Sequence, residues 1–351
     1  MTVFKHPRLL VDLGGPEISR AERALLDHPC LAGFVLFEKN IRDSMQVRDL
    51  CSEILTARSD LIIGIDHEGG RIQSVIGGGI TSVPAMRELW GGVKVFGVEE
   101  ARLAYALGFV MGKELRDHGV TMVFSPVLDL DYGVDEVIGD RAFHCNPDMV
   151  YRICSSLVDG FHAVDMMCCG KHFPGHGFAT VSTDSIPVDL RCLDEMHLDW
   201  MPYEKLSSKL DAIMVGHVNF PRVDENLASC SEYWVSGRLR GDLGYKGLII
   251  ADDISMPAAR MEGDKRGVII KAASAGNDLI MVFNEDSVEE KLDLLNLCLG
   301  VQSEIFLGFP FVNCGSSSFN GRKAEGGSLG GGDYEGLRDV VVEAILKLNN
   351  S

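Results

Sequence analysis

The sequence has little positive charge and no long apolar run, and both absences exclude classes of protein. No apolar stretch approaches the roughly 18–20 residues that a membrane span needs. The first residues, MTVFKHPRLLVDLGG, have neither the basic start nor the long apolar stretch of a secretory signal. The 51 acidic residues outnumber the 33 Lys and Arg, and the formal charge is −18, whereas binding to a phosphate backbone needs clustered cations. We therefore expect a cytoplasmic protein without nucleic-acid or membrane partners.

The motifs of several metal and nucleotide sites are also missing. The ten cysteines form no C-x-x-C pair, and Cys168 and Cys169 are adjacent in an apolar run. Neighbouring residues of a strand point to opposite faces, so these two thiols cannot easily bind one metal. The chain contains no H-E-x-x-H, no P-loop and no G-x-G-x-x-G after a strand. We expect reduced, mostly buried thiols and neither a metal nor an organic cofactor.

Short apolar runs alternate with longer segments of helical period along most of the chain. The eight runs are Arg8–Gly14, Gly33–Phe37, Leu61–Asp66, Met122–Leu130, Met166–His172, Ala212–Val218, Gly247–Asp252 and Asp278–Asn284. Continuous alternation of strand and helix predicts a parallel sheet, because parallel neighbours need a long crossover. Eight such units favour an α/β protein with a single closed (β/α)8 barrel of the TIM type. An open, doubly wound sheet is the alternative.

The composition changes after the last run. Residues 1–300 are predicted to form the barrel, and residues 301–351 a Gly/Ser-rich linker followed by a helix. The linker is the segment Cys314–Gly332, whose composition is typical of flexible chain. The segment Leu337–Asn349 has the amphipathic pattern of a helix that packs on the barrel wall.

Polar residues stand at the ends of most of the predicted strands. They are Asp66, Asp129, Lys171, His172, His217, Asp252, Asp253 and Asn284. Catalytic groups of (β/α)8 barrels lie where the strands end and the following loops begin. Burying so many charged groups is costly unless they are paired or used, although any one of them could belong to a structural ion pair. The pattern predicts a functional site at this rim.

Two of these strand ends carry distinctive local sequences. The fifth run leads into KHFPGHG at 171–177, which on its own could bind an anion, form a Schiff base, ligate a metal or serve as a polar turn. The seventh run ends in two consecutive carboxylates, Asp252 and Asp253. In strand geometry only one of them can point to the barrel axis. The other is free to cap a helix or to hold a turn.

Six segments together resemble glycoside hydrolase family 3, and within it the bacterial single-domain β-N-acetylglucosaminidases of peptidoglycan recycling. They are IDHEGGR at 65–71, SPVLDL at 125–130, GDRAFH at 139–144, KHFPGHG at 171–177, MVGHV at 214–218 and ADDISM at 251–256. The resemblance covers about residues 8–300. It implies a retaining glycosidase that uses one carboxylate as nucleophile and one protonated group on the leaving oxygen.

The resemblance also assigns roles to single residues. Asp252 matches the nucleophile, and Asp253 fills the variable place after it. The residues implied to contact the sugar are Asp66, Arg71, Arg141, Lys171, His172 and His217. Ala251 and Ile254 depart from the usual letters beside the nucleophile, and His67 replaces a more usual Gln. Opposite charge from basic neighbours would keep the nucleophile ionised.

The loop after the fifth strand departs from the family pattern. Single-domain members carry Asp-Ser-His there as the general acid/base, whereas this loop reads FATVSTDSIPVD from Phe178 to Asp189. Counting from the glycine of the motif places the dyad at Ser182 and Asp184. Matching the residue types instead aligns Asp-Ser-His with Asp184, Ser185 and Ile186. Neither alignment supplies the histidine. Three explanations remain open. Asp184 acts alone as the general acid, His176 takes the place of the missing histidine, or the chain has lost its general acid.

The sequence therefore predicts a glycosidase that removes terminal β-N-acetylglucosamine from muropeptide fragments, with Asp252 and Asp184 as its catalytic residues. It is expected to be a monomer. A catalytically impaired sugar-binding homologue is the alternative, and a Schiff-base lyase that uses Lys171 is a third hypothesis. The central spatial prediction is that Asp252 projects into the barrel mouth and faces Lys171 and Arg71 across a pocket for one hexose.

Overall fold

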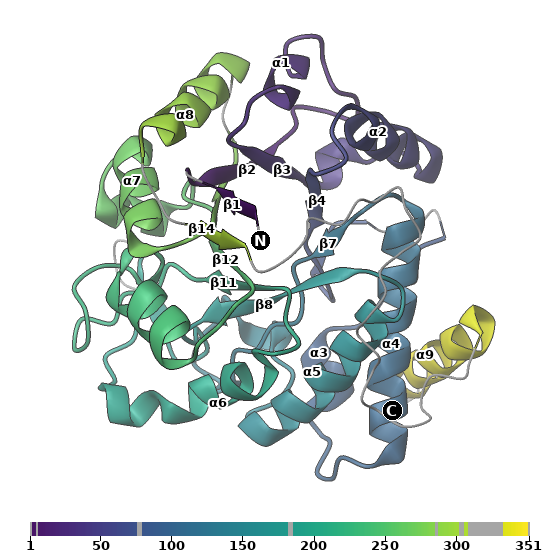
Figure 1. The fold of residues 1–351 in the computed structure, drawn as a ribbon. Helices are drawn as coiled ribbons and strands as arrows, with labels where there is room; N and C mark the ends of the chain where they lie inside the picture. Colours follow the sequence, from purple (N-terminus) through teal and green to yellow (C-terminus); the bar gives the residue numbers. More distant parts are fainter. Residues whose placement is uncertain are drawn as a thin grey trace.

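Eight parallel strands close into a barrel in the computed structural model of the chain (Figure 1). The structure describes residues 2–4, 6–75, 79–181, 185–284, 287–301, 305–307 and 333–349. The ring is closed because β11 pairs with both β12 and β8, and β13 pairs with β2. The strands are β2 (Arg8–Asp12), β3 (Leu31–Leu36), β4 (Ile62–Ile65), β7 (Met122–Val123), β8 (Met167–Phe173), β11 (Ala212–Val215), β12 (Leu248–Ala251) and β13 (Leu279–Val282). The (β/α)8 prediction is confirmed, and the open sheet is wrong.

Helices surround the barrel, as the alternating pattern predicts (Figure 1). They are α1 (Arg23–Leu26), α2 (Ser44–Ala57), α3 (Met86–Trp90), α4 (Val98–Asp117), α5 (Pro147–His162), α6 (His197–Leu206), α7 (Lys265–Ala275) and α8 (Val288–Gly300). Between β11 and β12 a π-helical segment, Tyr233–Asp242, takes the place of a regular α-helix. None of the helices in the described part of the chain is both long and apolar enough to cross a membrane.

The strands divide the apolar core into an inner and an outer layer. In β2, Leu10 packs inside the barrel, whereas Leu9 and Val11 pack against the helices. The same alternation places Cys169 inside and Cys168 outside, as strand geometry predicts. Each fully buried aliphatic side chain of this kind contributes about 1.5–3 kcal/mol relative to its exposed state.

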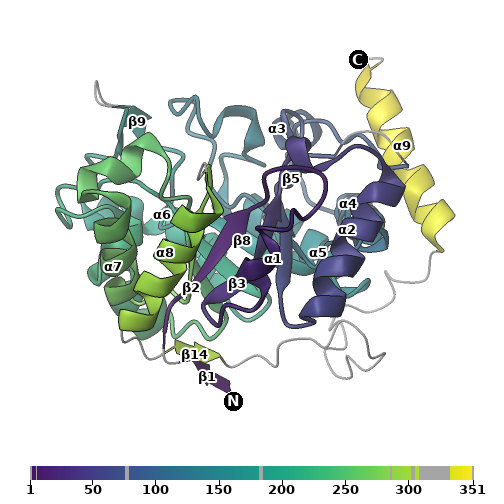
Figure 2. The same cartoon turned by 90° about the horizontal axis from the view of Figure 1, so that it is seen from above.

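Three elements come from the end regions of the chain. Strand β1 (Thr2–Phe4) pairs antiparallel with β14 (Ile305–Leu307), and the pair lies across one end of the barrel (Figures 1 and 2). Helix α9 (Tyr334–Asn349) packs against α4 and buries Leu337 and Val341. The Tyr334 hydroxyl donates a hydrogen bond to the Glu114 carboxylate at 2.8 Å. The predicted linker lies outside the described residues.

Candidate active site

The carboxyl ends of the strands bring polar side chains together above the apolar interior. Leu248 and Ile250 of β12 face the barrel interior, and the backbone N–H of Asp252 continues the ladder to Val215 at 3.1 Å. Since side chains alternate along a strand, Asp252 lies on the same inner face as Ile250. Lys171 follows Cys169 on β8 by the same spacing. The structure thus directs both residues to the barrel mouth.

A buried cluster of opposite charges surrounds Lys171. Its Nζ lies 2.5 Å from Asp66 Oδ1 and 2.5 Å from Glu68 Oε1. Arg141 donates to the same Glu68 carboxylate through Nε at 2.8 Å and Nη2 at 2.9 Å. Planar guanidinium and carboxylate groups pair well in this two-point arrangement. Glu68 belongs to the short strand β5 (His67–Gly69), which pairs with β6 (Ile72–Gln73) beyond the end of β4.

These pairs determine the charges of the cluster. Burial by itself would raise the pKa of Glu68, but the positive charges of Lys171 and Arg141 lower it to about 2. Burial would lower the pKa of Lys171, but Asp66 and Glu68 outweigh that effect and raise it. Lys171 is therefore a fixed ammonium that can donate hydrogen bonds to sugar hydroxyls. A Schiff base needs a neutral amine, so the lyase hypothesis for Lys171 is disfavoured.

Two buried histidines of the KHFPGHG loop are each held by an aspartate. His172 Nδ1 donates to Asp129 Oδ2 at 2.7 Å, and His176 Nδ1 donates to Asp135 Oδ2 at 2.5 Å. The Asp129 carboxylate also accepts the backbone N–H groups of His172 and His176. Asp129 thus fixes the shape of the loop and the tautomer of His172. The other ring nitrogen of His172 lies 3.4 Å from Arg141 Nη2, beside the charge cluster.

Asp252 is ionised despite its burial. Burial by itself would raise its pKa, but His217, His172 and Lys171, together with the backbone N–H of Asp253, hold that pKa below its usual range. The Asp253 N–H donates to Asp252 Oδ1 at 2.8 Å. A carboxylate with a low pKa, placed at the end of a barrel strand, meets the requirement for a nucleophile at neutral pH.

The second carboxylate of the pair, Asp253, holds a backbone turn. It accepts the Ser255 N–H at 3.0 Å, the Ser255 hydroxyl at 2.5 Å and the Phe283 N–H at 3.1 Å. Its side chain thus ties the loop after β12 to the end of β13. Of the two roles left open for the second carboxylate, capping a helix or holding a turn, Asp253 holds the turn.

His217 supports the same turn. Its Nε2 lies 2.9 Å from the carbonyl oxygen of Asp253, and its Nδ1 lies 2.7 Å from the Ser229 hydroxyl. A carbonyl only accepts, so Nε2 carries a proton, whereas the Ser229 hydroxyl can either donate to Nδ1 or accept from it. Both ring nitrogens are therefore engaged by the protein. His217 acts on Asp252 by its proximity, and its predicted contact with a sugar would require one of these bonds to exchange.

Arg71 lies at the edge of the site rather than beside the nucleophile. Its side chain is 47% exposed, and its Nε lies 3.2 Å from Asp140 Oδ1. Its Nη2 donates to the carbonyl oxygen of Val137 at 2.5 Å. The charges that act on Asp252 come from His217, His172 and Lys171. Of the two basic groups predicted to face Asp252, Lys171 is near enough to lower the pKa of Asp252 but pairs with Asp66 and Glu68, and Arg71 pairs with Asp140.

A cavity of about 800 Å³ opens beside these groups. Asp66, Arg71 and Asp253 line it, together with Lys39 and Phe283. Ligand pockets commonly enclose roughly 300–1,000 Å³. The cavity therefore has room for a hexose and is lined by both polar and apolar groups, although Asp252 and Lys171 are not among its lining residues. Its lining residues belong to the segments that follow β3, β4, β12 and β13. In Figure 2 the pair β1 and β14 lies at the opposite end of the barrel.

The sequence by itself assigns no role to two residues of the site, Glu68 and Asp129. Glu68 pairs with both Lys171 and Arg141, yet only its motif neighbours were assigned roles. Its position two residues after the strand-end Asp66, within IDHEGGR, is the available signal. Asp129 is a polar strand end in the sequence, but the sequence indicates no role for it. Asp184 falls outside the described part of the chain.

Comparisons with known proteins identify the family of the chain. The profile of the glycosyl hydrolase family 3 N-terminal domain matches residues 5–301. A β-hexosaminidase of Aromatoleum aromaticum is 42% identical over 295 residues, which cover 82% of each chain. A β-hexosaminidase of Bordetella avium is 41% identical over 291 residues, which cover 81% of this chain and 82% of the relative.

Solved structures are similar over most of the chain. NagZ from Neisseria gonorrhoeae in complex with N-trifluoroacetyl-D-glucosamine matches with a TM-score of 0.76 and 35% identity, over 86% of this chain and 92% of that chain. The native form of NagZ from the same organism matches with a TM-score of 0.77 and 30% identity, over 97% and 98% of the two chains. The resemblance stated from the motifs is confirmed: this chain belongs to glycosyl hydrolase family 3 and is a glycosidase of the β-hexosaminidase type.

Proposed function

We propose that the chain is a retaining β-N-acetylglucosaminidase that removes terminal β-N-acetylglucosamine from peptidoglycan fragments through a covalent glycosyl-enzyme on Asp252. The observation that carries this proposal is the ionised, inward-pointing Asp252 beside Lys171 and His172. The β-hexosaminidase relatives and the N-trifluoroacetyl-D-glucosamine complex of NagZ support the choice of sugar. We further propose that the protein acts as a cytoplasmic monomer, without a cofactor and without nucleic-acid or membrane partners.

The charge cluster would bind the sugar before the chemistry begins. Lys171 and Arg141 donate charge-assisted hydrogen bonds to hydroxyl groups, and Asp66 accepts from them. His172 Nε2 lies beside them, 3.4 Å from Arg141 Nη2. Because these groups are already held by Glu68 and Asp129, binding a sugar costs little additional ordering.

The reaction then proceeds in two displacements. Asp252 attacks the anomeric carbon as the bond to the leaving oxygen breaks, and Asp184 gives its proton to that oxygen. Asp184, now a carboxylate, takes a proton from water, whose oxygen attacks the same carbon and displaces Asp252. The released sugar keeps the β configuration. Such general acid catalysis typically contributes about 10²–10⁴-fold to the rate.

His176 is a poor substitute for the acid. It is buried, and its Nδ1 is bound to Asp135 at 2.5 Å. Its backbone N–H is bound to Asp129 at 2.8 Å. Moving its ring to the leaving oxygen would break a buried ion pair, which costs several kcal/mol. Asp184 therefore remains the proposed acid.

The stereochemistry of hydrolysis tests the covalent step. With 4-nitrophenyl N-acetyl-β-glucosaminide, proton NMR at early times should show the β-anomer of free N-acetylglucosamine before mutarotation. The α-anomer as first product would contradict the proposal. For the acid, Asp184→Ala should slow substrates with poor leaving groups far more than activated aryl glycosides. An equal loss on both would exclude Asp184 from that role.

A second candidate is a sugar-binding homologue with little turnover. The absence of the family's histidine in the loop after the fifth strand favours it. All groups proposed to hold the sugar would serve a binding protein equally well. Calorimetry that shows N-acetylglucosamine binding, combined with no product after long incubation with muropeptide fragments, would favour this second function over the first.

A further inference from the structure

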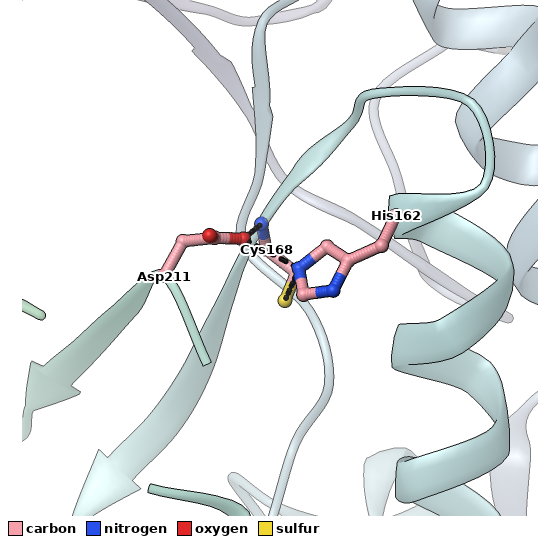
Figure 3. A group of neighbouring side chains, drawn as sticks. All are labelled: His162, Cys168 and Asp211. Carbon is pink, nitrogen blue, oxygen red and sulfur yellow. Dashed lines mark hydrogen bonds and ion pairs between the residues drawn. The ribbon is translucent and has the colours of Figure 1, made fainter. Parts of the chain in front are cut away.

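Three potential metal ligands, His162, Cys168 and Asp211, lie close together outside the sugar site (Figure 3). His162 is the last residue of α5, Cys168 is near the start of β8, and Asp211 directly precedes β11. Asp252 and Lys171 lie at the opposite ends of their parallel strands. These three residues have no part in the sugar site.

The three side chains converge on one position. Their ligand atoms all lie within 4.8 Å of one another. His162 Nε2 lies 2.8 Å from Asp211 Oδ2 and 3.8 Å from Cys168 Sγ. Figure 3 shows the imidazole, the thiol and the carboxylate turned toward each other from three different segments. Cys168 and Asp211 are buried, and the His162 side chain is 22% exposed, which leaves a route from solvent.

This arrangement differs from a nucleophilic relay. In a Cys-His-Asp relay, one ring nitrogen binds the carboxylate and the other faces the thiol. Here a single nitrogen, Nε2 of His162, faces both the carboxylate and the sulfur. Burial and the nearby Asp211 raise the pKa of the Cys168 thiol well above its usual range, so the free thiol is a poor nucleophile. Atoms arranged around one point suit a bound cation better.

The ligand chemistry selects zinc among the common divalent cations. Zinc binds thiolate, imidazole and carboxylate at roughly 2.0–2.3 Å, which places ligand atoms roughly 3.3–3.6 Å apart in a tetrahedron. The two distances from His162 Nε2 lie on either side of that range. Calcium and magnesium prefer oxygen ligands only. Water would supply the fourth ligand from the exposed side of His162.

We propose that His162, Cys168 and Asp211 form a binding site for a single zinc ion on the amino-terminal side of the barrel. The ion would join α5, β8 and β11, and the thiol proton would leave to solvent as the zinc–sulfur bond forms. At this end of the barrel the ion would stabilise the fold and take no part in hydrolysis. It would bind whether or not the chain is a glycosidase.

Titration of the metal-free full-length chain with zinc alone, and separately with cobalt(II) alone, tests the site. Equilibrium dialysis should find one zinc ion bound per chain, and this ion should no longer bind when the site is removed by mutation. The midpoint of thermal unfolding should rise with zinc concentration because the ion binds only the folded state. Cobalt should produce the near-ultraviolet sulfur-to-metal absorption that requires a thiolate ligand. Cys168→Ser should abolish this absorption and the thermal shift.

Two further variants make the result specific. Cys169→Ser removes the adjacent buried thiol, which faces the barrel interior, and should preserve both signals. His162→Gln, at the partly exposed end of α5, keeps a donor for Asp211 and should weaken zinc binding at least tenfold, even if Cys168→Ser fails to fold. Cobalt that binds elsewhere, such as at the rim histidines, would give no sulfur-to-metal absorption. Absence of that absorption, or its persistence in His162→Gln at unchanged affinity, would overturn the proposal.

Discussion

Lys171 and Glu68 form an ion pair in which each side chain is only 2% exposed, with Nζ 2.5 Å from Oε1. The pair joins β8 to the hairpin that follows β4, and Arg141 binds the other side of the same carboxylate. A buried charge that loses its partner is costly, whereas an intact network holds its members in place. If Lys171 and Arg141 bind the sugar as proposed, Glu68 acts on it through them, as a positioning residue.

Removing the charge of Glu68 should cost both stability and activity. Glu68→Gln leaves Lys171 and Arg141 with less compensating charge, and we expect the free energy of unfolding to fall by about 3–5 kcal/mol. The matched control is Asp140→Asn, which breaks the exposed pair with Arg71 and should change stability by at most about 1 kcal/mol. Urea unfolding compares the two variants. Equal effects would contradict the special role of the buried pair.

The stability of the fold at acidic pH should depend on the Glu68 carboxylate. The pKa of Glu68 is about 2 in the fold and about 4.3 in an unfolded chain. Its contribution to stability is therefore fully present above about pH 4.3 and is lost as the pH falls toward 2, since the unfolded state binds the proton first. The stability difference between the wild-type chain and Glu68→Gln should shrink over this window. A constant difference from pH 6 to 2.5 would argue against the lowered pKa.

Strand positions were predictable because they depend on local alternation. Each predicted run overlaps one strand of the barrel, and the opposite directions of Cys168 and Cys169 follow from the two-residue period. Asp252 could be placed at the mouth for the same reason. The fourth run was overextended, since only Met122–Val123 is a barrel strand. The chain beyond that strand instead forms an isolated bridge between Val127 and Lys171.

The remaining features depend on contacts between distant segments, which no local pattern encodes. Glu68 meets Arg141 across 73 positions of sequence, and Arg71 turns to Asp140 across 69. The pairing of β1 with β14 joins the two ends of the barrel sequence. Periodicity indicates which residues reach the rim, but it does not show which residues form ion pairs with each other. The same limit hid the approach of His162 to Cys168 and Asp211.

The two consecutive carboxylates should respond differently to the same small change. Asp252→Asn keeps an oxygen for the Asp253 N–H, so the fold should persist, but the amide is a poor nucleophile. We expect hydrolysis of 4-nitrophenyl N-acetyl-β-glucosaminide to fall by roughly 10⁴-fold or more. Asp253→Asn keeps acceptors for the Ser255 and Phe283 N–H groups and should retain most turnover. Comparable loss in both variants would contradict the assignment of Asp252 as nucleophile.

Helix α9 should contribute to stability through its buried side chains and leave the sugar site intact. Leu337 is 3% exposed where α9 packs on α4, whereas Leu346 on the same helix is 55% exposed. Leu337→Ala should therefore lower the free energy of unfolding by about 2–5 kcal/mol, and Leu346→Ala by at most about 0.5 kcal/mol. Thermal and urea unfolding measure the difference, with kcat/KM unchanged in both variants. Equal stability of the two variants would show that the helix does not remain docked on the barrel in solution.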